Sequence, residues 1–265
     1  MKTFCVLTGV VWLVALLLVH LLGLSPNSID LSAVLQASSM QHWFGTDELG
    51  RDVFARVCHG LQVSVCVSVI VTVVTVSIGL LCGLLAGYYG GWADHLLMQV
   101  TDVVLAFPGL LLAIALAAVL GPGLPNLILA LCLTGWVSVA RLTRTQALSL
   151  RQRAHVLAAQ SLGASDGRII AQHILPLLRS IVLVEATYSM ASVMIAEAAL
   201  SFLGIGVQAP EASWGGMLRD AVRFMLVSPH YVLSIGASMM SLILAINLGG
   251  DWMRDQWDVR SEGQL

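Results

Sequence analysis

The sequence predicts an all-α membrane protein, a polytopic bundle of six transmembrane helices with a cytoplasmic helix-turn-helix. Of its 265 residues, 58% are hydrophobic and only 11% are charged, whereas soluble domains carry about 25% charged residues. The mean hydropathy is +0.88. Six apolar runs each come near the length of about 20 residues that a helix needs to cross a bilayer. These observations favour a single membrane domain, residues 1–265.

The first apolar run, 4–24, is longer than the apolar core of a secretory signal and has no small-residue cleavage site after it. We therefore interpret it as a retained span. A polar outer segment, 25–60, follows. The remaining spans are predicted at 61–87, 98–120, 124–140, 181–203 and 231–248, with a second outer loop at 204–230 and a tail at 249–265.

The orientation follows from the basic residues. The longest hydrophilic stretch between spans, 141–180, contains six arginines: Arg141, Arg144, Arg151, Arg153, Arg168 and Arg179. Basic loops stay on the cytoplasmic side of a membrane, so this stretch is predicted to be cytoplasmic. With six spans, both termini are then cytoplasmic. Nine basic residues lie inside and four outside in this arrangement.

Two features within the spans bear on packing. Gly79, Gly83 and Gly87 recur every four residues in the second span, which predicts a surface where another helix backbone approaches closely. Pro108 in the third span lacks a backbone N–H and is expected to kink that helix. The five cysteines are scattered through the chain, mostly in apolar runs, and are interpreted as small buried hydrophobic residues.

Several functions are excluded by what the chain lacks. The only lysine is Lys2, so no phosphate-binding P-loop and no ATPase site is expected. The net charge of -2 provides no basic field for nucleic acid. Residues 163–167 match the G-x-S-x-G elbow of hydrolases, but that motif follows a strand, and 155–162 is predicted to be helical.

The better interpretation of this region is a helix-turn-helix. Gly163 ends the first helix, Ser165 caps the second, and Pro176 closes it. Two short helices at an angle, outside a bundle without an ATPase site, suit docking into a groove of another protein.

Residues 151–176 resemble the EAA coupling loop of bacterial ABC importer permeases, although Leu157 and His173 stand where that pattern has Glu and Ile. The resemblance implies that the ATPase contacts are made by Ala158, Ala159, Gly163, Ala164, Ser165, Leu175 and Pro176. Arg153 and Arg168 are either partners of acidic groups on the ATPase or solvated topology signals. The alternative is a self-contained surface hairpin.

Other blocks resemble dipeptide, oligopeptide and nickel importer permeases. They occur in the family's order and lie at 42–52, 86–94, 107–108, 200–208, 213–215 and 247–255. The resemblance implies a heterodimer with a second permease, two cytoplasmic ATPase subunits that bind ATP and magnesium, and an external solute-binding protein. It also implies a bacterial inner membrane location, import of small peptides, nickel or metal chelates, and no cofactor in this chain. Alternatives are a gradient-driven secondary transporter, a membrane hydrolase and an ABC exporter half.

Three carboxylates lie in or beside apolar runs, where a charged group is costly and suggests function. Asp102 and Glu185 lie near predicted inner helix ends, and for Asp102 we expect stabilisation of a helix N-terminus. Glu197 lies deeper, toward the outside. It is either a translocation-path residue for a cationic group or a hydrogen-bonded link between helices.

The outer segment is expected to be structural. Arg51, flanked by Asp47, Glu48 and Asp52, predicts a hydrogen-bonded turn that braces the loop. His42, His59 and His230 have the side chain that suits nickel, but they lie in separate segments without ligand spacing, so no metal site is predicted.

Overall fold

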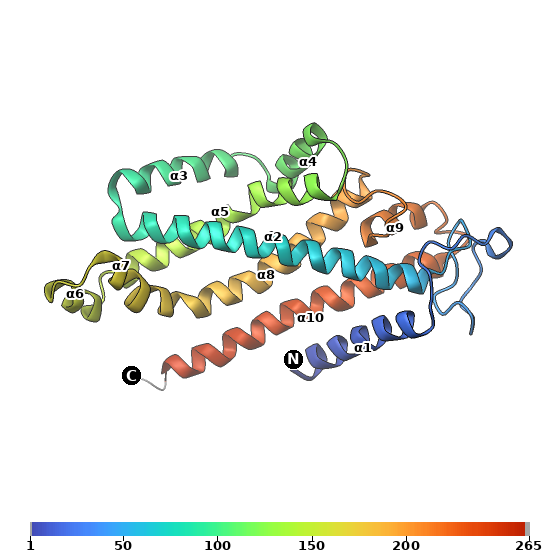
Figure 1. The fold of residues 1–265 in the computed structure, drawn as a ribbon, viewed down its shortest axis with the longest axis horizontal. Coiled ribbons are helices and arrows are strands. Elements are labelled where there is room, and N and C mark those ends of the chain that lie inside the picture. Colours follow the sequence, from blue (N-terminus) through green and yellow to red (C-terminus); the bar gives the residue numbers. More distant parts are fainter. Residues whose placement is uncertain (1, 263–265) are drawn as a thin grey trace.

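The computed structural model describes residues 2–262 and the side chains of residues 3–256. Its regular structure in this range is helical (Figure 1). Five helices are long and apolar enough to cross a membrane: α1 (Lys2–Leu21), α2 (Val53–Tyr89), α5 (Leu124–Leu150), α8 (Leu175–Phe202) and α10 (Pro229–Glu262). The bent pair α3 (Gly91–Leu105) and α4 (Gly109–Leu120) makes a sixth span if it is counted as one.

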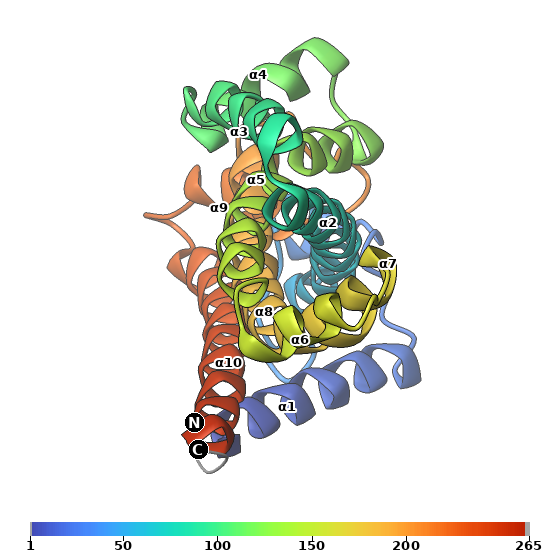
Figure 2. The same cartoon turned by 90° about the vertical axis from the view of Figure 1, so that its left-hand side faces the viewer.

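The short elements lie at opposite ends of the bundle (Figure 1). Helices α6 (Ala154–Ser161) and α7 (Asp166–Ile169) project at one end, which we call the hairpin end. A π-helical turn, η2 (Ile170–Ile174), joins α7 to α8. At the other end, called the loop end, lie residues 22–52, with the 3-10 turn η1 (Leu31–Ala33), and helix α9 (Trp214–Val222). Viewed from the hairpin end, α3 and α4 lie on one side of the central helices and α1 on the other (Figure 2).

Several helices extend beyond the predicted spans. Helix α2 starts at Val53 rather than at 61, because the Asp52 carboxylate accepts a hydrogen bond of 2.8 Å from the Ala55 amide and caps it. Helix α5 continues past 140 to Leu150, so the connection expected to start at 141 is largely helical there. Hydropathy shows which residues suit lipid, whereas caps decide where a helix ends. Of the predicted tail, 263–265 lies outside the described residues.

The third predicted span, 98–120, is not one kinked helix. The chain breaks between α3 and α4, and the two axes differ by 82°. Pro108 stands just before α4 with an extended backbone (φ -55°, ψ 124°), since its ring removes the N–H that would continue the helix. The expected kink is therefore a complete break. Asp102 consequently lies in the last turn of α3, so the expectation that it stabilises a helix N-terminus is wrong.

The predicted close helix contact is confirmed between α2 and α5. A Cβ atom added to Gly79 would lie 2.6 Å from the Val139 Cβ, and one added to Gly87 would lie 2.6 Å from the Arg144 carbonyl oxygen. An added Cβ at Gly83 would collide with the Ala140 carbonyl oxygen. The stripe therefore lets two backbones meet without side chains between them.

The cysteines are all free. Their predicted burial is correct only in part, because Cys58 is buried but Cys66 is exposed on the surface of α2. In a membrane helix an apolar side chain is stable against lipid as well as against protein, so hydropathy alone does not indicate burial.

Candidate functional site

One face of the hairpin is anchored to the bundle. Val156, Ile169 and Ile174 are completely buried. They form a cluster with apolar side chains of α2, α5 and α8. This cluster fixes the position of the hairpin at the end of the helices.

Polar contacts tie the hairpin to the end of α2. The Tyr88 hydroxyl donates a hydrogen bond of 2.8 Å to Asp166 at the start of α7. Arg151 Nη1 donates to the carbonyl oxygens of Gly87 and Tyr88, at 3.3 and 3.0 Å. A cation at the C-terminal carbonyl groups of a helix is stabilising. Sequence reasoning missed the roles of Tyr88 and Arg151, which depend on contacts across more than 60 residues.

The turn between the two short helices is formed as predicted at Gly163. Its φ of +80° is the left-handed conformation that glycine adopts without steric cost. The Gly163 amide bonds to Gln160 O at 2.9 Å, and the Ala164 amide bonds to Ala159 O at 3.1 Å, which closes α6. Because helix α6 precedes the G-x-S-x-G match, the rejection of a hydrolase elbow is confirmed.

Two details of the predicted hairpin need correction. Ser165 occupies the N-cap position of α7, but its side chain makes no capping hydrogen bond. Pro176 does not close the second helix, because it lies in the first turn of α8. Proline is tolerated there since the amides of a first turn have no intrahelical partner.

The rest of the hairpin surface is exposed, and leucines lie there among polar side chains such as Arg153 and Arg168. Leu162 is 88% exposed, Leu157 is 49% exposed and Leu175 is 39% exposed. A Cβ atom added to Gly163 would have no neighbouring atom within 4 Å. Of the predicted contact residues, Ala158, Gly163, Ser165, Leu175 and Pro176 are exposed, whereas Ala159 and Ala164 are partly buried against the hairpin's own cluster. Sequence reasoning did not single out Leu162.

Four of the six arginines of the predicted cytoplasmic stretch form two pairs with different surroundings. Arg144 and Arg141 lie on α5 and bind Asp94 and Asp102 of α3, with Arg144 Nη2 2.6 Å from Asp94 Oδ2. Arg153 and Arg168 are exposed and have no ion-pair partner among the described side chains. The first pair holds α3 against α5, and the second pair is open to a partner.

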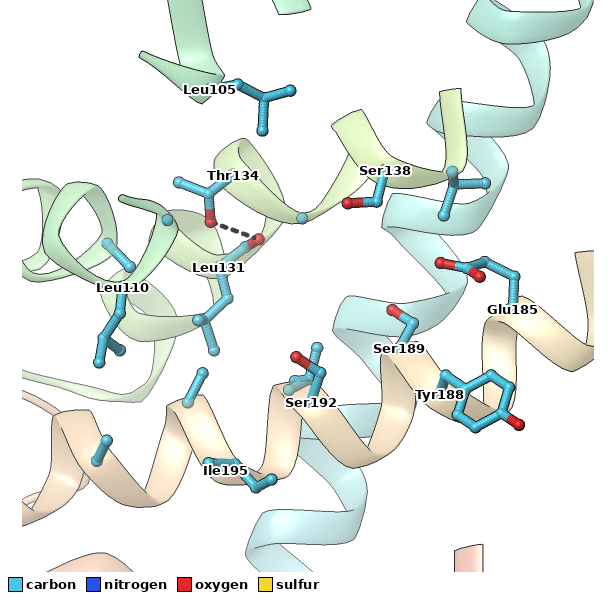
Figure 3. Close-up of a pocket in the computed structure, with 17 residues that line it drawn as sticks. Leu105, Leu110, Leu131, Thr134, Ser138, Glu185, Tyr188, Ser189, Ser192 and Ile195 are labelled. Atoms are coloured by element: carbon cyan, nitrogen blue, oxygen red, sulfur yellow. Dashed lines mark hydrogen bonds between the residues drawn. The ribbon is translucent and has the colours of Figure 1, made fainter. Parts of the chain in front are cut away.

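A cavity of about 520 Å³ lies between α4, α5 and α8. Apolar side chains such as Leu110, Leu131 and Ile195 line one part of it (Figure 3). The wall also carries the polar side chains of Thr134, Ser138, Glu185, Tyr188, Ser189 and Ser192. Glu185, which was noted in the sequence only as a costly carboxylate, therefore lies on the cavity wall.

Glu197 lies elsewhere on α8 and is completely buried. Its two carboxylate oxygens accept hydrogen bonds from Ser64 Oγ of α2 at 2.7 Å and from Ser201 Oγ at 2.8 Å. It is not among the residues that line the cavity. This geometry corresponds to the interhelical link that the sequence left open beside a path-lining role.

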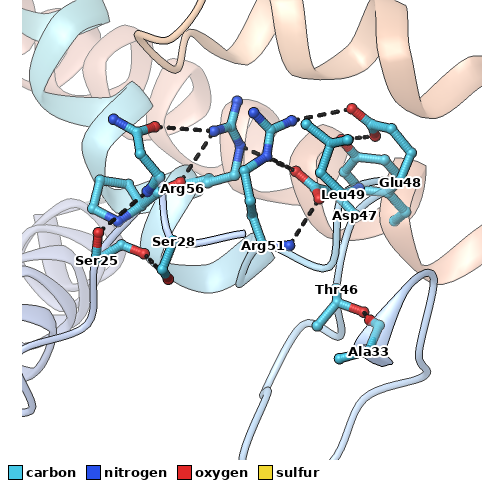
Figure 4. A network of polar contacts seen from close by, with 12 residues as sticks. Ser25, Ser28, Ala33, Thr46, Asp47, Glu48, Leu49, Arg51 and Arg56 are labelled. Atoms are coloured by element: carbon cyan, nitrogen blue, oxygen red, sulfur yellow. Dashed lines mark hydrogen bonds and ion pairs between the residues drawn. The ribbon is translucent and has the colours of Figure 1, made fainter. Parts of the chain in front are cut away.

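The loop end carries the braced turn predicted around Arg51 (Figure 4). The buried Asp47 carboxylate lies 2.6 Å from Arg51 Nε and 3.5 Å from Arg56 Nε. It also accepts the amides of Leu49 and Arg51, each at 2.9 Å. The Glu48 carboxylate lies 3.1 Å from Arg51 Nη2. Structural bracing by this network is confirmed.

Two of the three outer histidines pair with different carboxylates, whereas His230 lies beside Gly45 and its buried Nε2 has no hydrogen-bond partner among the described residues. His42 Nδ1 lies 2.7 Å from Asp52 Oδ2, and His59 Nε2 lies 3.2 Å from Glu211 Oε2. Within the described part of the chain, no three His, Cys, Asp or Glu side chains come together as a possible metal site.

Comparisons with known proteins agree with this geometry. A family model described as "Binding-protein-dependent transport system inner membrane component" matches residues 79–260. The glutathione transport system permease protein GsiD of Escherichia coli O157:H7 is 42% identical over 237 residues, covering 89% of this chain and 78% of the relative. The dipeptide transport system permease protein DppC of Alkalihalophilus pseudofirmus is 40% identical over 224 residues, covering 84% of this chain and 74% of the relative.

A solved structure supports the same fold. A chain of the MetNI methionine ABC transporter in an inward-facing conformation matches with a TM-score of 0.59 at 17% sequence identity. The match covers 74% of this chain and 94% of that chain. The structural match shows the fold, and the family model and the two relatives show that the chain belongs to the inner membrane components of binding-protein-dependent transport systems.

Proposed function

We propose that this chain is a permease subunit of an ATP-driven importer and forms half of a translocation pathway for small peptides. The hairpin is the observation that carries the proposal. Its inner face is buried in the bundle, while Leu157, Leu162 and Leu175 face outward without a partner in the chain. An apolar surface beyond the end of a membrane helix is in water unless another protein covers it.

The proposed assembly contains a second permease in a heterodimer, two cytoplasmic ATPase subunits and an external solute-binding protein. ATP and magnesium bind to the ATPase subunits. The hairpin end and both termini are then on the cytoplasmic side, and the loop end faces the binding protein. Ala158, Gly163, Ser165, Leu175 and Pro176 support this arrangement because they are exposed beside the leucines. Ala159 and Ala164 position the hairpin from within.

Small peptides are proposed as cargo because the two named relatives carry glutathione and dipeptide in their names. Nickel and metal chelates are the second cargo class that the sequence resemblance allows. Competition between a labelled dipeptide and nickel during uptake separates the two. Inhibition by unlabelled peptide but not by nickel is expected.

The substitution Leu162→Glu tests the docking surface. The complex would be purified through a tag on this chain, and its ATPase content and cargo-stimulated ATP hydrolysis measured. We expect at least a tenfold loss of stimulated hydrolysis, because a carboxylate would have to be desolvated in an apolar contact. The thermal unfolding of this chain should not change, because Leu162 is 88% exposed.

Leu31→Glu is the matched control. Leu31 is 72% exposed at the loop end, so the same change there should leave ATPase binding intact. Full cargo-stimulated hydrolysis by the Leu162→Glu complex would contradict the proposed docking face. Concentrative uptake by this chain without any ATPase would favour the gradient-driven alternative.

A further inference from the structure

The cavity between α4, α5 and α8 has an unusual charge pattern. Among the residues that line it, Glu185 is the only one with a charged side chain. Lysine, arginine and histidine are absent from its wall. A group with positive charge is therefore attracted to this wall, whereas an anion finds no countercharge on it.

Glu185 also differs from four other carboxylates of the bundle. Glu197 is bound by two serines, Asp94 and Asp102 are paired with arginines, and Asp251 accepts a hydrogen bond from Tyr188. Within the part of the chain that the structure describes, Glu185 has neither a hydrogen bond nor an ion pair. A partly buried carboxylate without a partner is costly in a membrane protein and marks a functional group.

Two hydroxyl groups without hydrogen bonds lie near this carboxylate. Ser138 of α5 and Ser189 of α8 line the same part of the cavity wall as Glu185 (Figure 3). Serines within helices commonly donate to a carbonyl one turn earlier, as Ser238 does to Ser234 O at 2.7 Å. Neither Ser138 nor Ser189 makes such a bond within the described residues. Their oxygen atoms are therefore available to a ligand.

We propose that Glu185, with Ser138 and Ser189, forms a transient binding point for the ammonium group of the passing cargo. An alkylammonium has three N–H donors and no acceptor. One carboxylate and two hydroxyl oxygens match these donors and replace the water that the cation leaves behind. The cavity volume of about 520 Å³ is within the range of small-molecule sites. The inference rests on the proposed peptide import and names the cargo group that this subunit binds.

The binding point is tested by uptake into proteoliposomes that contain the complete complex. Two peptides would be compared, one with a free N-terminus and one N-acetylated, chosen so that the wild-type complex imports both. Glu185→Gln should lower uptake of the free peptide about tenfold relative to the acetylated one. Glu185→Asp, which keeps the charge, should restore most of the preference. The same binding protein would be used with every variant, so its own selectivity cancels when the uptake ratios of the variants are compared.

Glu197→Gln is the matched control, because it removes a carboxylate from the same helix away from the cavity. The ratio of uptake of the two peptides should stay at the wild-type value in this variant. An unchanged ratio in Glu185→Gln would overturn the proposal, as would equal loss for both peptides. Loss of the second permease on purification would also overturn it, since Glu185 would then serve assembly.

Failure of this inference is distinguishable from failure of the proposed function. If the wild-type complex imports neither peptide, peptide import itself is wrong. If the wild-type complex imports both and only the predicted ratio change is missing, peptide import stands and the binding point does not.

Discussion

The loop end and the hairpin end of this molecule differ in how their side chains are satisfied. At the loop end, Asp47 is completely buried and is bound by two arginines and two backbone amides. At the hairpin end, the buried face is apolar and Leu162 on the other face is 88% exposed. The buried carboxylate of the loop end is satisfied within the chain, while apolar side chains are exposed at both ends, since Met40 is 96% and Leu31 is 72% exposed at the loop end. In the proposed assembly, the exposed leucines of the hairpin end are the ones that the ATPase covers.

The two ends of the chain meet different requirements, one for a stable shape and one for contact with a partner protein. In the proposed assembly, the loop end must retain its shape when a binding protein docks and departs, and internal ion pairs supply that shape. The proposed coupling surface must transmit force to a partner, which agrees with a hairpin that is anchored on one face and exposed on the other. Substitutions at the loop end are therefore expected to affect stability, and those at the open face to affect assembly.

The largest loss of stability is expected from Asp47→Ala. Removing this carboxylate leaves Arg51 and Arg56 without their shared buried partner, and breaking a buried ion pair costs about 3–5 kcal/mol. The measurement is thermal unfolding of the purified complex in detergent, with ATPase association followed in parallel. Glu48→Ala is the control, since Glu48 is more exposed and contacts only one of the arginines. Equal stability of both variants would remove the distinction between the two ends.

The second test concerns the helices between the two ends. It is the substitution Gly83→Ala on α2, at the contact with α5. The added methyl group would collide with the Ala140 carbonyl oxygen, and overpacking of this kind costs about 1–3 kcal/mol. Gly236→Ala in α10 is the control because nothing lies within 4 Å of its added Cβ, so it should be neutral or slightly stabilising. Unfolding would be measured under the same conditions. If both variants unfold alike, the stripe does not set the contact between α2 and α5.

The sequence predicted the spans and their contacts better than it predicted the polar pairs. Hydropathy found the apolar helices, and the four-residue spacing of Gly79 and Gly83 indicated the face that meets α5. The partner of Asp102, by contrast, is Arg141, which lies 39 residues away on another helix. The sequence around Asp102 does not show an ion pair with a residue on another helix, so Asp102 was assigned to the wrong helix end.

The residues of the cavity also could not be predicted from local sequence pattern. Glu185 and Glu197 are separated by 12 residues on one helix, and both looked costly in the sequence. Only the arrangement of α2, α4 and α5 around α8 places Glu185 on the cavity wall and Glu197 between serines. Likewise Pro108 predicted a disturbance of the third span, but the size of the break, 82°, could not be predicted from the sequence.

The smallest effect is expected from Tyr88→Phe, which removes one of the polar ties between the hairpin and α2. The hydrogen bond to Asp166 is 2.8 Å long, and its loss should cost about 1 kcal/mol. Because Val156 and Ile169 remain buried, the hairpin should stay folded but open more often. Hydrogen exchange of amides in 154–169 should therefore accelerate about fivefold while the unfolding temperature changes little.

Tyr89→Phe is the matched control for that experiment, since Tyr89 is 55% exposed and its hydroxyl donates to no group among the described residues. Both substitutions keep the ring contact between Tyr88 and Tyr89, so faster exchange in both variants would mean that the effect does not come from the hydrogen bond to Asp166. Faster exchange in Tyr88→Phe alone would show that a single hydroxyl limits opening at the hairpin end. The anchored face would then be as specifically braced as the loop end, and only the outward face would depend on a partner.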